Sequence, residues 1–199
     1  ELIHITDGKG FFYEAAILKN DPAQCDFKIA SKTPEPPKDF FIHIAIAPTK
    51  NADRIEWFVE KAVEFGVNKV SLIECEHSER IFSKTDRLKK IAVTAMKQSL
   101  KATLPQIEGL LRLDSIIACA DEDQKFIAHV DQSNPLHLKD AARKGLRYLV
   151  LIGPEGDFST KELQLAKEKD FQKISLGSSR LRTETAGIAA CHILNLINI

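Results

Sequence analysis

Two loops in the last third of the chain combine glycines, carboxylates and arginines in a spacing that suits ligand chemistry. The first covers residues 153–158 (Gly-Pro-Glu-Gly-Asp-Phe) and follows an apolar run at 148–152. The second covers residues 176–185 (Leu-Gly-Ser-Ser-Arg-Leu-Arg-Thr-Glu-Thr) and also precedes a helical pattern. Loops of this kind meet at the carboxyl edge of a parallel sheet, where α/β proteins place their sites. The sequence therefore predicts a ligand pocket between them.

The first loop does not have the features of a phosphate-binding loop. It lacks the G-K-[ST] ending of a Walker loop and the G-x-G-x-x-G spacing of a dinucleotide fold. Its acidic residues, Glu155 and Asp157, would repel a phosphate. They favour a cationic or neutral adenosine-type ligand. A tight strand-to-helix turn that binds no ligand is the alternative interpretation.

The second loop carries more specific signals. Leu176 and Leu181 flank polar residues, as a pocket for a flat base requires. Thr183 or Thr185 can cap the last helix and Glu184 suits its first turn, which is the structural explanation for these three. Arg182 has no such explanation, because a positive charge beside a helix start is unfavourable. We expect a functional role for Arg182.

A basic segment lies between residues 80 and 101, with seven basic residues and one acidic residue, Asp86. The chain as a whole has a formal net charge of zero, so this local excess is distinctive. A solvated helix face explains it, and so does contact with an RNA backbone, with Gln98 and Ser99 as further hydrogen-bonding groups. Both interpretations stay open. The basic residues are Arg80, Lys84, Arg87, Lys89, Lys90, Lys97 and Lys101.

Composition limits the other possibilities. The 199 residues suffice for one domain with a small appendage, and no apolar run is long enough to span a membrane. The four cysteines are widely spaced, which predicts free thiols and a cytoplasmic location. The six histidines show no ligand spacing, so no metal site is expected. His43 and His192 are expected in or near the core, while His129 ends a strand and could line the pocket.

Strand-like segments at 2–6, 11–18 and 24–30 open the chain. A proline-rich segment at 32–38 then predicts a stiff linker and a domain boundary. From residue 40, apolar runs alternate with amphipathic stretches, which predicts a parallel sheet covered by helices on both faces.

The expected strands of this larger domain are 40–47, 70–75, 125–130, 147–152 and 174–176. Two helices are expected to end at residues 65 and 169. Four more are expected at 86–101, 115–120, 138–144 and 183–197. Asn51 and Asp53 are both candidate caps of the helix that ends at 65, and Asp53–Glu56 resembles a capping box. A second capping box is predicted at Ser159–Glu162, and Leu100 is expected to be buried.

With both loops in view, the sequence resembles the RsmE family of ribosomal RNA methyltransferases, members of the trefoil-knotted SPOUT superfamily. The matching motifs are Leu-Ile-Gly-Pro-Glu-Gly at 151–156, Ser-Leu-Gly at 175–177 and Leu-Arg-Thr-Glu-Thr-Ala at 181–186. Supporting matches lie at 60–67, 78–80 and 95–99. Three positions depart from the family pattern: Asp157 replaces a usual glycine, Lys97 a frequent glutamate and Lys101 a common arginine.

This resemblance implies a fold and an activity. The fold would be an α/β SPOUT methyltransferase domain at 38–199 with a C-terminal trefoil knot, preceded at 1–37 by a partial PUA-like β-domain whose first strands are absent. The activity would be methylation of N3 of a uridine in 16S ribosomal RNA, with S-adenosylmethionine as donor. A homodimer that acts on the small subunit is implied, without membrane or metal.

The resemblance and the residue chemistry together give the expected site residues. Arg182 would stabilise negative charge on the base carbonyls, and Glu184 is the candidate general base. Glu155 could favour the sulfonium cation of the donor. The RNA-binding candidates are Arg80, Lys84, Arg87, Lys97 and Lys101. The donor-binding candidates are His129, Ile152, Gly153, Glu155, Gly156, Leu176, Gly177, Leu181, Arg182 and Thr185.

Three alternatives stay open. One is a SPOUT methyltransferase that acts on another RNA position. Another is a non-catalytic RNA-binding or assembly factor that kept the fold, which need not bind the donor. The third is a plain nucleotide-binding domain, disfavoured by the missing fingerprint and the acidic first loop.

Overall fold

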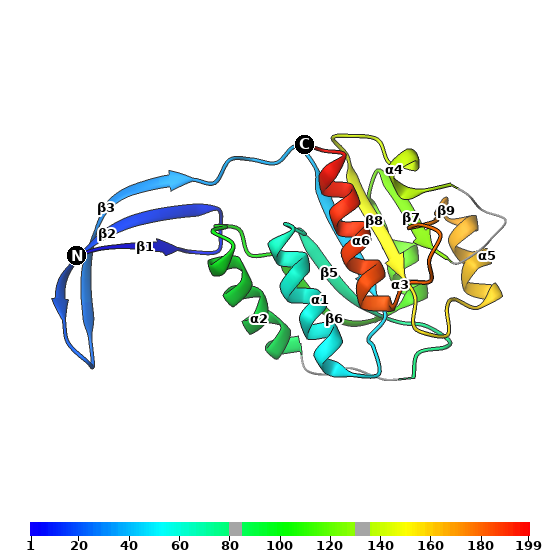
Figure 1. Cartoon of the computed structure of the whole chain (residues 1–199), viewed down its shortest axis with the longest axis horizontal. Coiled ribbons are helices and arrows are strands. Elements are labelled where there is room, and N and C mark those ends of the chain that lie inside the picture. The colour runs from blue at the N-terminus through cyan, green and yellow to red at the C-terminus, as the bar shows by residue number, and fades with distance from the viewer. Residues whose placement is uncertain (80–84, 130–135) are drawn as a thin grey trace.

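A computed structural model describes residues 1–79, 85–129 and 136–199. It contains a six-stranded sheet and a separate three-stranded sheet. Figure 1 shows the small sheet projecting from a main body formed by the large sheet and its helices.

The large sheet has the order β6-β5-β4-β8-β7-β9, and all of its strand pairs are parallel. The two central strands, β4 and β8, are almost entirely buried, which explains why each reads as a continuous apolar run. The strands are β4 (Phe41–Ile46), β5 (Lys69–Glu74), β6 (Gln106–Arg112), β7 (Gln124–Ala128), β8 (Arg147–Ile152) and β9 (Gln172–Ile174).

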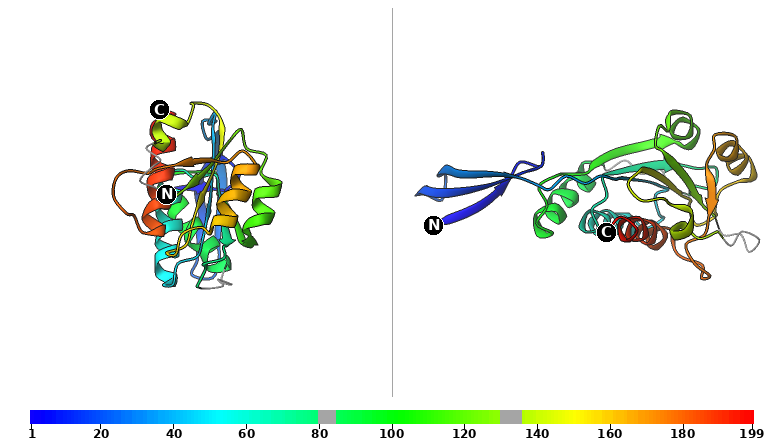
Figure 2. Two further views of the ribbon diagram at one scale, coloured as in Figure 1. Left: turned by 90° about the vertical axis from the view of Figure 1, so that its right-hand side faces the viewer. Right: turned by 90° about the horizontal axis from the view of Figure 1, so that it is seen from above.

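Helices cover both faces of this sheet, as Figure 2 shows in its left view. One apolar core lies under α1 (Ala52–Glu64), α2 (Thr85–Gln98), α4 (Leu138–Ala141) and α6 (Thr183–Leu196). A second, smaller core lies under α3 (Leu113–Cys119) and α5 (Thr160–Glu168). The prediction of a parallel sheet covered on both faces is confirmed.

The predicted helix starts had mixed outcomes. The Ser159 hydroxyl accepts from the backbone N–H of Glu162, and the Glu162 carboxylate accepts from the N–H of Ser159, which confirms that capping box. The capping box predicted at Asp53 was wrong. Asn51 is the N-cap of α1, because its side-chain oxygen accepts from the N–H of Asp53 at 3.0 Å.

The structure differs from the sequence analysis at two further places, β6 (Gln106–Arg112) and Leu100. β6 was not predicted, because an edge strand interrupted by Glu108 and Gly109 lacks a continuous apolar run. Leu100 was expected to be buried but is 82% exposed. The helix ends at Gln98, and Leu100 adopts φ 54° as the chain turns away.

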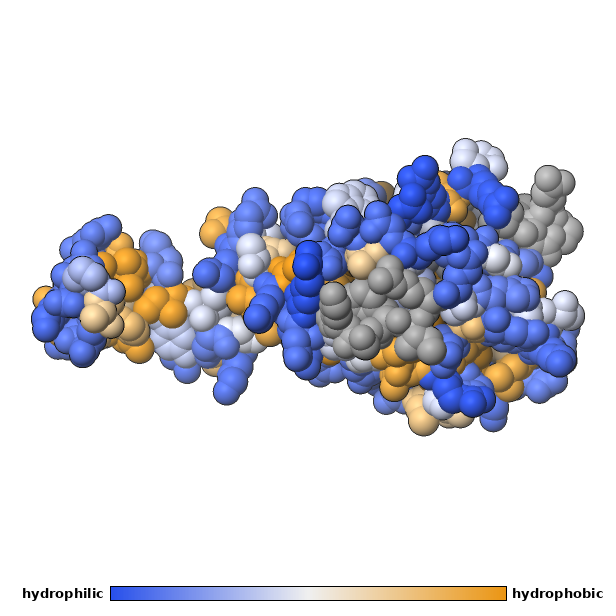
Figure 3. Space-filling model, turned by 90° about the horizontal axis from the view of Figure 1, so that it is seen from below, coloured by the Kyte–Doolittle hydropathy of each residue, from blue (hydrophilic) through white to orange (hydrophobic). Residues whose placement is uncertain are grey.

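The small sheet is antiparallel and contains β1 (Leu2–Thr6), β2 (Phe11–Asn20) and β3 (Cys25–Pro34). β3 extends to Pro34, so the strand continues into the segment predicted as linker. Three strands cannot bury their own apolar side chains, and hydrophobic atoms gather on this sheet in Figure 3. The exposed large residues there are Leu2, Leu18, Phe27 and Ile29.

Backbone hydrogen bonds fasten the small sheet to the body. The turn between β1 and β2 bonds to the segment that follows α2: Gly10 donates to the carbonyl of Ala102 and Leu104 donates to the carbonyl of Gly8, each at 2.9 Å. Glu35 adds a side-chain contact, because its carboxylate accepts from the Thr103 hydroxyl at 2.6 Å. The two sheets are therefore joined at the end of α2 as well as through the covalent linker.

A polar network joins strands β4, β5 and β6 to the segment just before β7. His43 of β4 is 2% exposed, as predicted, and its Nδ1 lies 2.7 Å from a Glu122 oxygen. Its Nε2 lies 2.8 Å from the hydroxyl of Ser71, which donates to Glu108 at 2.7 Å. Burial would raise the pKa of Glu122, but His43 outweighs that effect, and the pKa lies below its usual value. His192 lies in α6, a helix of the larger core, as expected, but its own side chain is exposed.

Close packing of α6 on α1 and β4 fixes where the last loop of the chain ends. A Cβ added to Gly187 of α6 would lie 2.5 Å from the ring of Phe58 and 3.0 Å from the side chain of Ile46. Glycine is therefore required for the two helices to approach this closely.

We predict that Gly187→Ala lowers the free energy of unfolding by about 1–3 kcal/mol, because overpacking outweighs the better helix propensity of alanine. Phe58→Leu should create room for the added methyl group. In the Phe58→Leu background, Gly187→Ala should therefore lower the free energy of unfolding by clearly less, which a double-mutant cycle shows as a favourable coupling. Urea denaturation at one fixed protein concentration measures all four variants. An equal loss in the free energy of unfolding in both backgrounds would contradict the packing explanation.

Candidate functional site

The loop that joins β8 to α5, residues 153–158, is held by the last loop of the chain. The hydroxyl of Thr183 donates to the carbonyl of Gly153 at 3.1 Å, and the guanidinium of Arg180 donates to the carbonyl of Glu155 at 3.4 Å. The two loops singled out in the sequence are therefore in direct contact at the carboxyl edge of the sheet, as predicted.

Three other loops at the same edge also contact residues 153–158. The backbone N–H of Lys50, after β4, donates to the Glu155 carboxylate at 3.3 Å. His77, after β5, places its Nδ1 3.1 Å from the carbonyl oxygens of both Gly156 and Asp157. Nδ1 of His129, after β7, lies 2.9 Å from the carboxylate of Asp157. This convergence fixes the shape of the first loop.

A cavity of about 410 Å³ lies between the two loops. Small-molecule sites in proteins have volumes of this order, with apolar walls and a few placed polar groups. Here the apolar walls are Ala128, Ile152, Leu181 and Ala186, and the charged side chains are Glu155, Asp157, Arg180 and Arg182. Gly153, Pro154 and Thr183 complete the described lining. The arrangement can hold a flat apolar group beside charged or polar groups.

The structure brings half of the expected donor-binding residues to this cavity: Ile152, Gly153, Glu155, Leu181 and Arg182. The other five lie nearby but outside the described lining. A Cβ on Gly156 would lie 3.0 Å from the Cβ of His77, so this glycine permits the close approach of the β5–α2 loop instead. Leu176 packs against the larger core, and Thr185 is exposed. Gly177 adopts φ 130°, and His129 contacts Asp157.

Glu184 does not line the cavity. It is 6% exposed, and its Oε1 lies 3.8 Å from Nε of Arg54 at the start of α1. Its Oε2 has no hydrogen-bond partner among the described residues. The carboxylate expected as general base is therefore buried between the first turns of α6 and α1.

The predicted threonine cap of α6 was wrong. Arg182 occupies the N-cap position, and no side-chain cap hydrogen bond is formed there. Thr183 uses its hydroxyl to bond Gly153 instead. Arg182 thus remains beside a helix start, where only a nearby negative charge favours it.

Sequence reasoning missed several lining residues. Arg180 could have been found, because it lies two residues before Arg182 in the same loop. Ala128 became recognisable only from strand register, since it pairs with Ile152 across β7 and β8. Asp157 was noted in the loop but was not assigned to the site.

The expected RNA-binding residues are in different situations. Arg80 and Lys84 lie outside the described residues. Lys97 is exposed on α2, whereas Arg87 pairs with Glu56 of α1 at 2.6 Å. The Lys101 ammonium donates to the carbonyl of Glu64 at 2.8 Å, and burial lowers its pKa. Lys101 therefore stabilises the end of α1.

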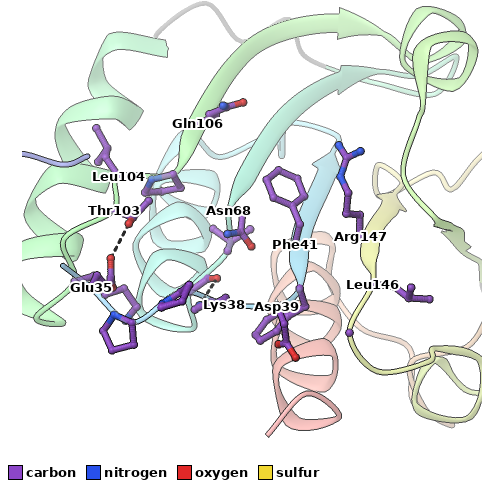
Figure 4. Close-up of a pocket in the computed structure, with 18 of the residues that line it drawn as sticks. Glu35, Lys38, Asp39, Phe41, Asn68, Thr103, Leu104, Gln106, Leu146 and Arg147 are labelled. Atoms are coloured by element: carbon purple, nitrogen blue, oxygen red, sulfur yellow. Dashed lines mark hydrogen bonds between the residues drawn. The ribbon is translucent and has the colours of Figure 1, made fainter. Parts of the chain in front are cut away.

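A second cavity, of about 570 Å³, lies at the opposite, amino-terminal edge of the sheet (Figure 4). The ammonium of Lys38 donates to the carbonyl of Gly66 at 3.1 Å, and Thr103 bonds Glu35. These polar groups connect the linker to the body and are already used in structural contacts.

Neither cavity is lined by three described His, Cys, Asp or Glu side chains arranged to hold a metal ion. Within the described ranges, no helix is both long and apolar enough to span a membrane.

Comparison with known proteins gives consistent matches. A family model described as an RNA methyltransferase domain matches residues 36–195. Ribosomal RNA small subunit methyltransferase E of Aquifex aeolicus is 31% identical over 192 residues, which cover 94% of this chain and 82% of that protein. The corresponding protein of Mesomycoplasma hyopneumoniae is 29% identical, covering 89% and 78%.

Solved structures agree with these matches. One described as a probable rRNA-methyltransferase from Porphyromonas gingivalis has a TM-score of 0.94 at 42% identity, covering 100% of this chain and 85% of that one. Ribosomal RNA small subunit methyltransferase E from Neisseria gonorrhoeae, bound to S-adenosyl methionine, has a TM-score of 0.84 at 25% identity, covering 100% and 84%.

We predict that Thr183→Val loosens the contact between the two loops, because the Gly153 carbonyl loses its donor while side-chain shape is kept. The free energy of unfolding should fall by about 1 kcal/mol. Amide hydrogen exchange in residues 153–158 should become faster. Thr185→Val is the matched control, since Thr185 is exposed in the same helical turn. Similar exchange rates in both variants would show that the Thr183 bond does not hold the loop.

Proposed function

The chain belongs to the RNA methyltransferase family that includes ribosomal RNA small subunit methyltransferase E, and from that premise we propose that it methylates small-subunit ribosomal RNA with S-adenosylmethionine as donor. We propose N3 of a uridine in 16S RNA as the acceptor. The observation that carries the proposal is the cavity between residues 153–158 and 180–183, with its apolar walls and its mixed charges.

The residues at this cavity suit such a donor. The apolar walls formed by the ends of β7 and β8 can pack against a flat adenine. The carboxylates of Glu155 and Asp157 complement a positive charge. When bound, S-adenosylmethionine supplies an electrophilic methyl group on a sulfonium sulfur.

The chain contributes positioning and electrostatics to the reaction. Fixed loops can hold two reactants in line, which removes much of the entropic barrier. Arg182 lines the cavity and is exposed, so its guanidinium can reach the carbonyl oxygens of an incoming base. There it would stabilise the negative charge that develops as the N3 proton leaves. Glu184 is buried against α1, so we infer that it positions the first turn of α6 and does not take the proton itself.

We also propose that the chain end is threaded as a trefoil knot within a methyltransferase domain at 38–199. Ser175, just after β9, forms backbone hydrogen bonds with Leu136 and Leu138. From that edge of the sheet the chain returns to α6, which packs on β4 and β8. This return of the chain past residues 153–158, which it contacts at Arg180 and Thr183, supports the proposed knot. We propose a PUA-like RNA-binding domain for residues 1–37, and a cytoplasmic location.

We further propose a homodimer formed through α1 and α6. Together these helices expose Trp57, Phe65 and Leu196, at 45%, 38% and 59%. The ring of Phe65 contacts His192 at 4.9 Å, which links the two helices into one surface. A second copy would cover these apolar residues.

We predict that Arg182→Ala lowers the rate of methyl transfer about 10²–10³-fold while donor affinity changes by less than about tenfold, because the arginine acts on charge in the transition state. Arg182→Lys should recover part of the rate, since it keeps the charge but not the planar fork. The assay uses labelled donor and small subunits that lack the modification, followed by mass mapping of the RNA. Arg143→Ala, an exposed arginine outside the cavity, is the control.

These measurements also separate the alternatives. A methylated nucleotide other than a uridine, or methylation of a ribose, would replace the proposed acceptor. Calorimetry that shows no binding of S-adenosylmethionine would instead favour a non-catalytic assembly factor.

We predict that Trp57→Glu converts the dimer to a monomer, because it replaces an exposed apolar side chain of the proposed interface with a charge. Light scattering coupled to size-exclusion chromatography gives the mass of the particle. Val93→Glu is the matched control: Val93 is a 38% exposed apolar residue on α2. A monomeric unsubstituted chain, or equal effects of both substitutions, would contradict the proposed interface.

A further inference from the structure

Asp157 combines two features at the cavity. Its φ is 61°, in the left-handed region, and the residue lines the cavity. A residue with a side chain adopts this conformation at a cost that glycine avoids. Such strained positions persist where surrounding contacts hold them, and they concentrate at ligand sites.

The surrounding contacts fix both the backbone and the side chain of Asp157. Its N–H donates to the carbonyl of Pro154 at 2.9 Å, and its own carbonyl oxygen lies 3.1 Å from Nδ1 of His77. One carboxylate oxygen accepts from the N–H of Phe158 at 2.8 Å. The other lies 2.9 Å from Nδ1 of His129, an ion-pair contact that lacks hydrogen-bond geometry. The position of the negative charge is therefore set before any ligand binds.

The charge is also partly removed from water, because the side chain of Asp157 is 35% exposed. A partly desolvated carboxylate acts on a nearby ligand charge more strongly than one in bulk water. The other charged side chains of the lining are Glu155, Arg180 and Arg182. Since these include both signs, they do not by themselves set a preference for a cation.

The proposed reaction changes the charge of the ligand by one unit. When the methyl group leaves, the electron pair of the carbon–sulfur bond stays on sulfur, and the sulfonium becomes a neutral thioether. The adenosine and amino-acid parts are the same before and after. We propose that Asp157 makes the cavity bind the cationic donor more tightly than its neutral product. After each reaction, a new donor molecule then replaces the demethylated product. This inference rests on the function proposed above.

The competing explanation is a local turn role, in which Asp157 only accepts the hydrogen bond of Phe158. Two substitutions separate these roles. Asp157→Asn keeps a side-chain acceptor and tolerates positive φ, but removes the charge. Asp157→Gly removes the charge and relieves the backbone strain, so the chain should still fold. Asp170 provides a matched control, because it is an aspartate at φ 63° that lies outside the cavity lining.

The experiment is calorimetric titration without RNA, at about pH 8, above the usual histidine range. The probes are S-adenosylmethionine, S-adenosylhomocysteine as the neutral product, and sinefungin, which carries an amine in place of the methylated sulfur. Asp157→Asn and Asp157→Gly should each weaken the two cationic probes about three- to tenfold and change the neutral probe less than about twofold. The corresponding Asp170 variants should change none of them.

Each outcome decides the question. If both Asp157 variants lose the preference for the cationic probes over the neutral probe, the proposal is supported. Unchanged affinity ratios in Asp157→Asn, or equal weakening of all three probes, would overturn it while leaving the methyltransferase function in place. If the unsubstituted chain binds none of the probes, both the proposed function and this inference fail.

Discussion

The hydrogen bond from the Thr183 hydroxyl to the Gly153 carbonyl joins the two loops from which the site is built. It connects the first residue of α6 to the end of β8, and it depends on how deeply α6 can pack. That depth is set by Gly187 against Phe58. The shape of the cavity therefore follows from helix packing about one turn away, as well as from the residues that line it.

Convergence of several loops gives the site its rigidity. Residues after β4, β5, β7 and β9 each contact residues 153–158, and two of these contacts use histidine nitrogens. Parallel strands bring all their carboxyl ends to one edge, so such convergence is available to this fold wherever loops are short. The chain uses it to hold a strained aspartate and an exposed arginine, Arg182, beside the same cavity.

Much of this arrangement was predictable from sequence, because local patterns carry it. The strand at 147–152, the Ser159 capping box and the pairing of the two glycine-containing loops all follow from residue type and spacing. The burial of Glu184 could not be predicted, because sequence gives its place in a helix but not the direction in which its side chain points. β6 and the role of Thr183 were missed because each depends on a partner distant in the chain.

The attachment of the small sheet has a mechanical consequence. This sheet extends from the body in Figures 1 and 2, and its bonds to residues 102–104 lie at the near end, beside the end of α2. Because the sheet is attached at one end only, a small rotation about Ala102 would displace the tip at its far end by a large distance. The stiffness of a few hydrogen bonds around Gly8, Gly10 and Glu35 decides how far that tip can swing.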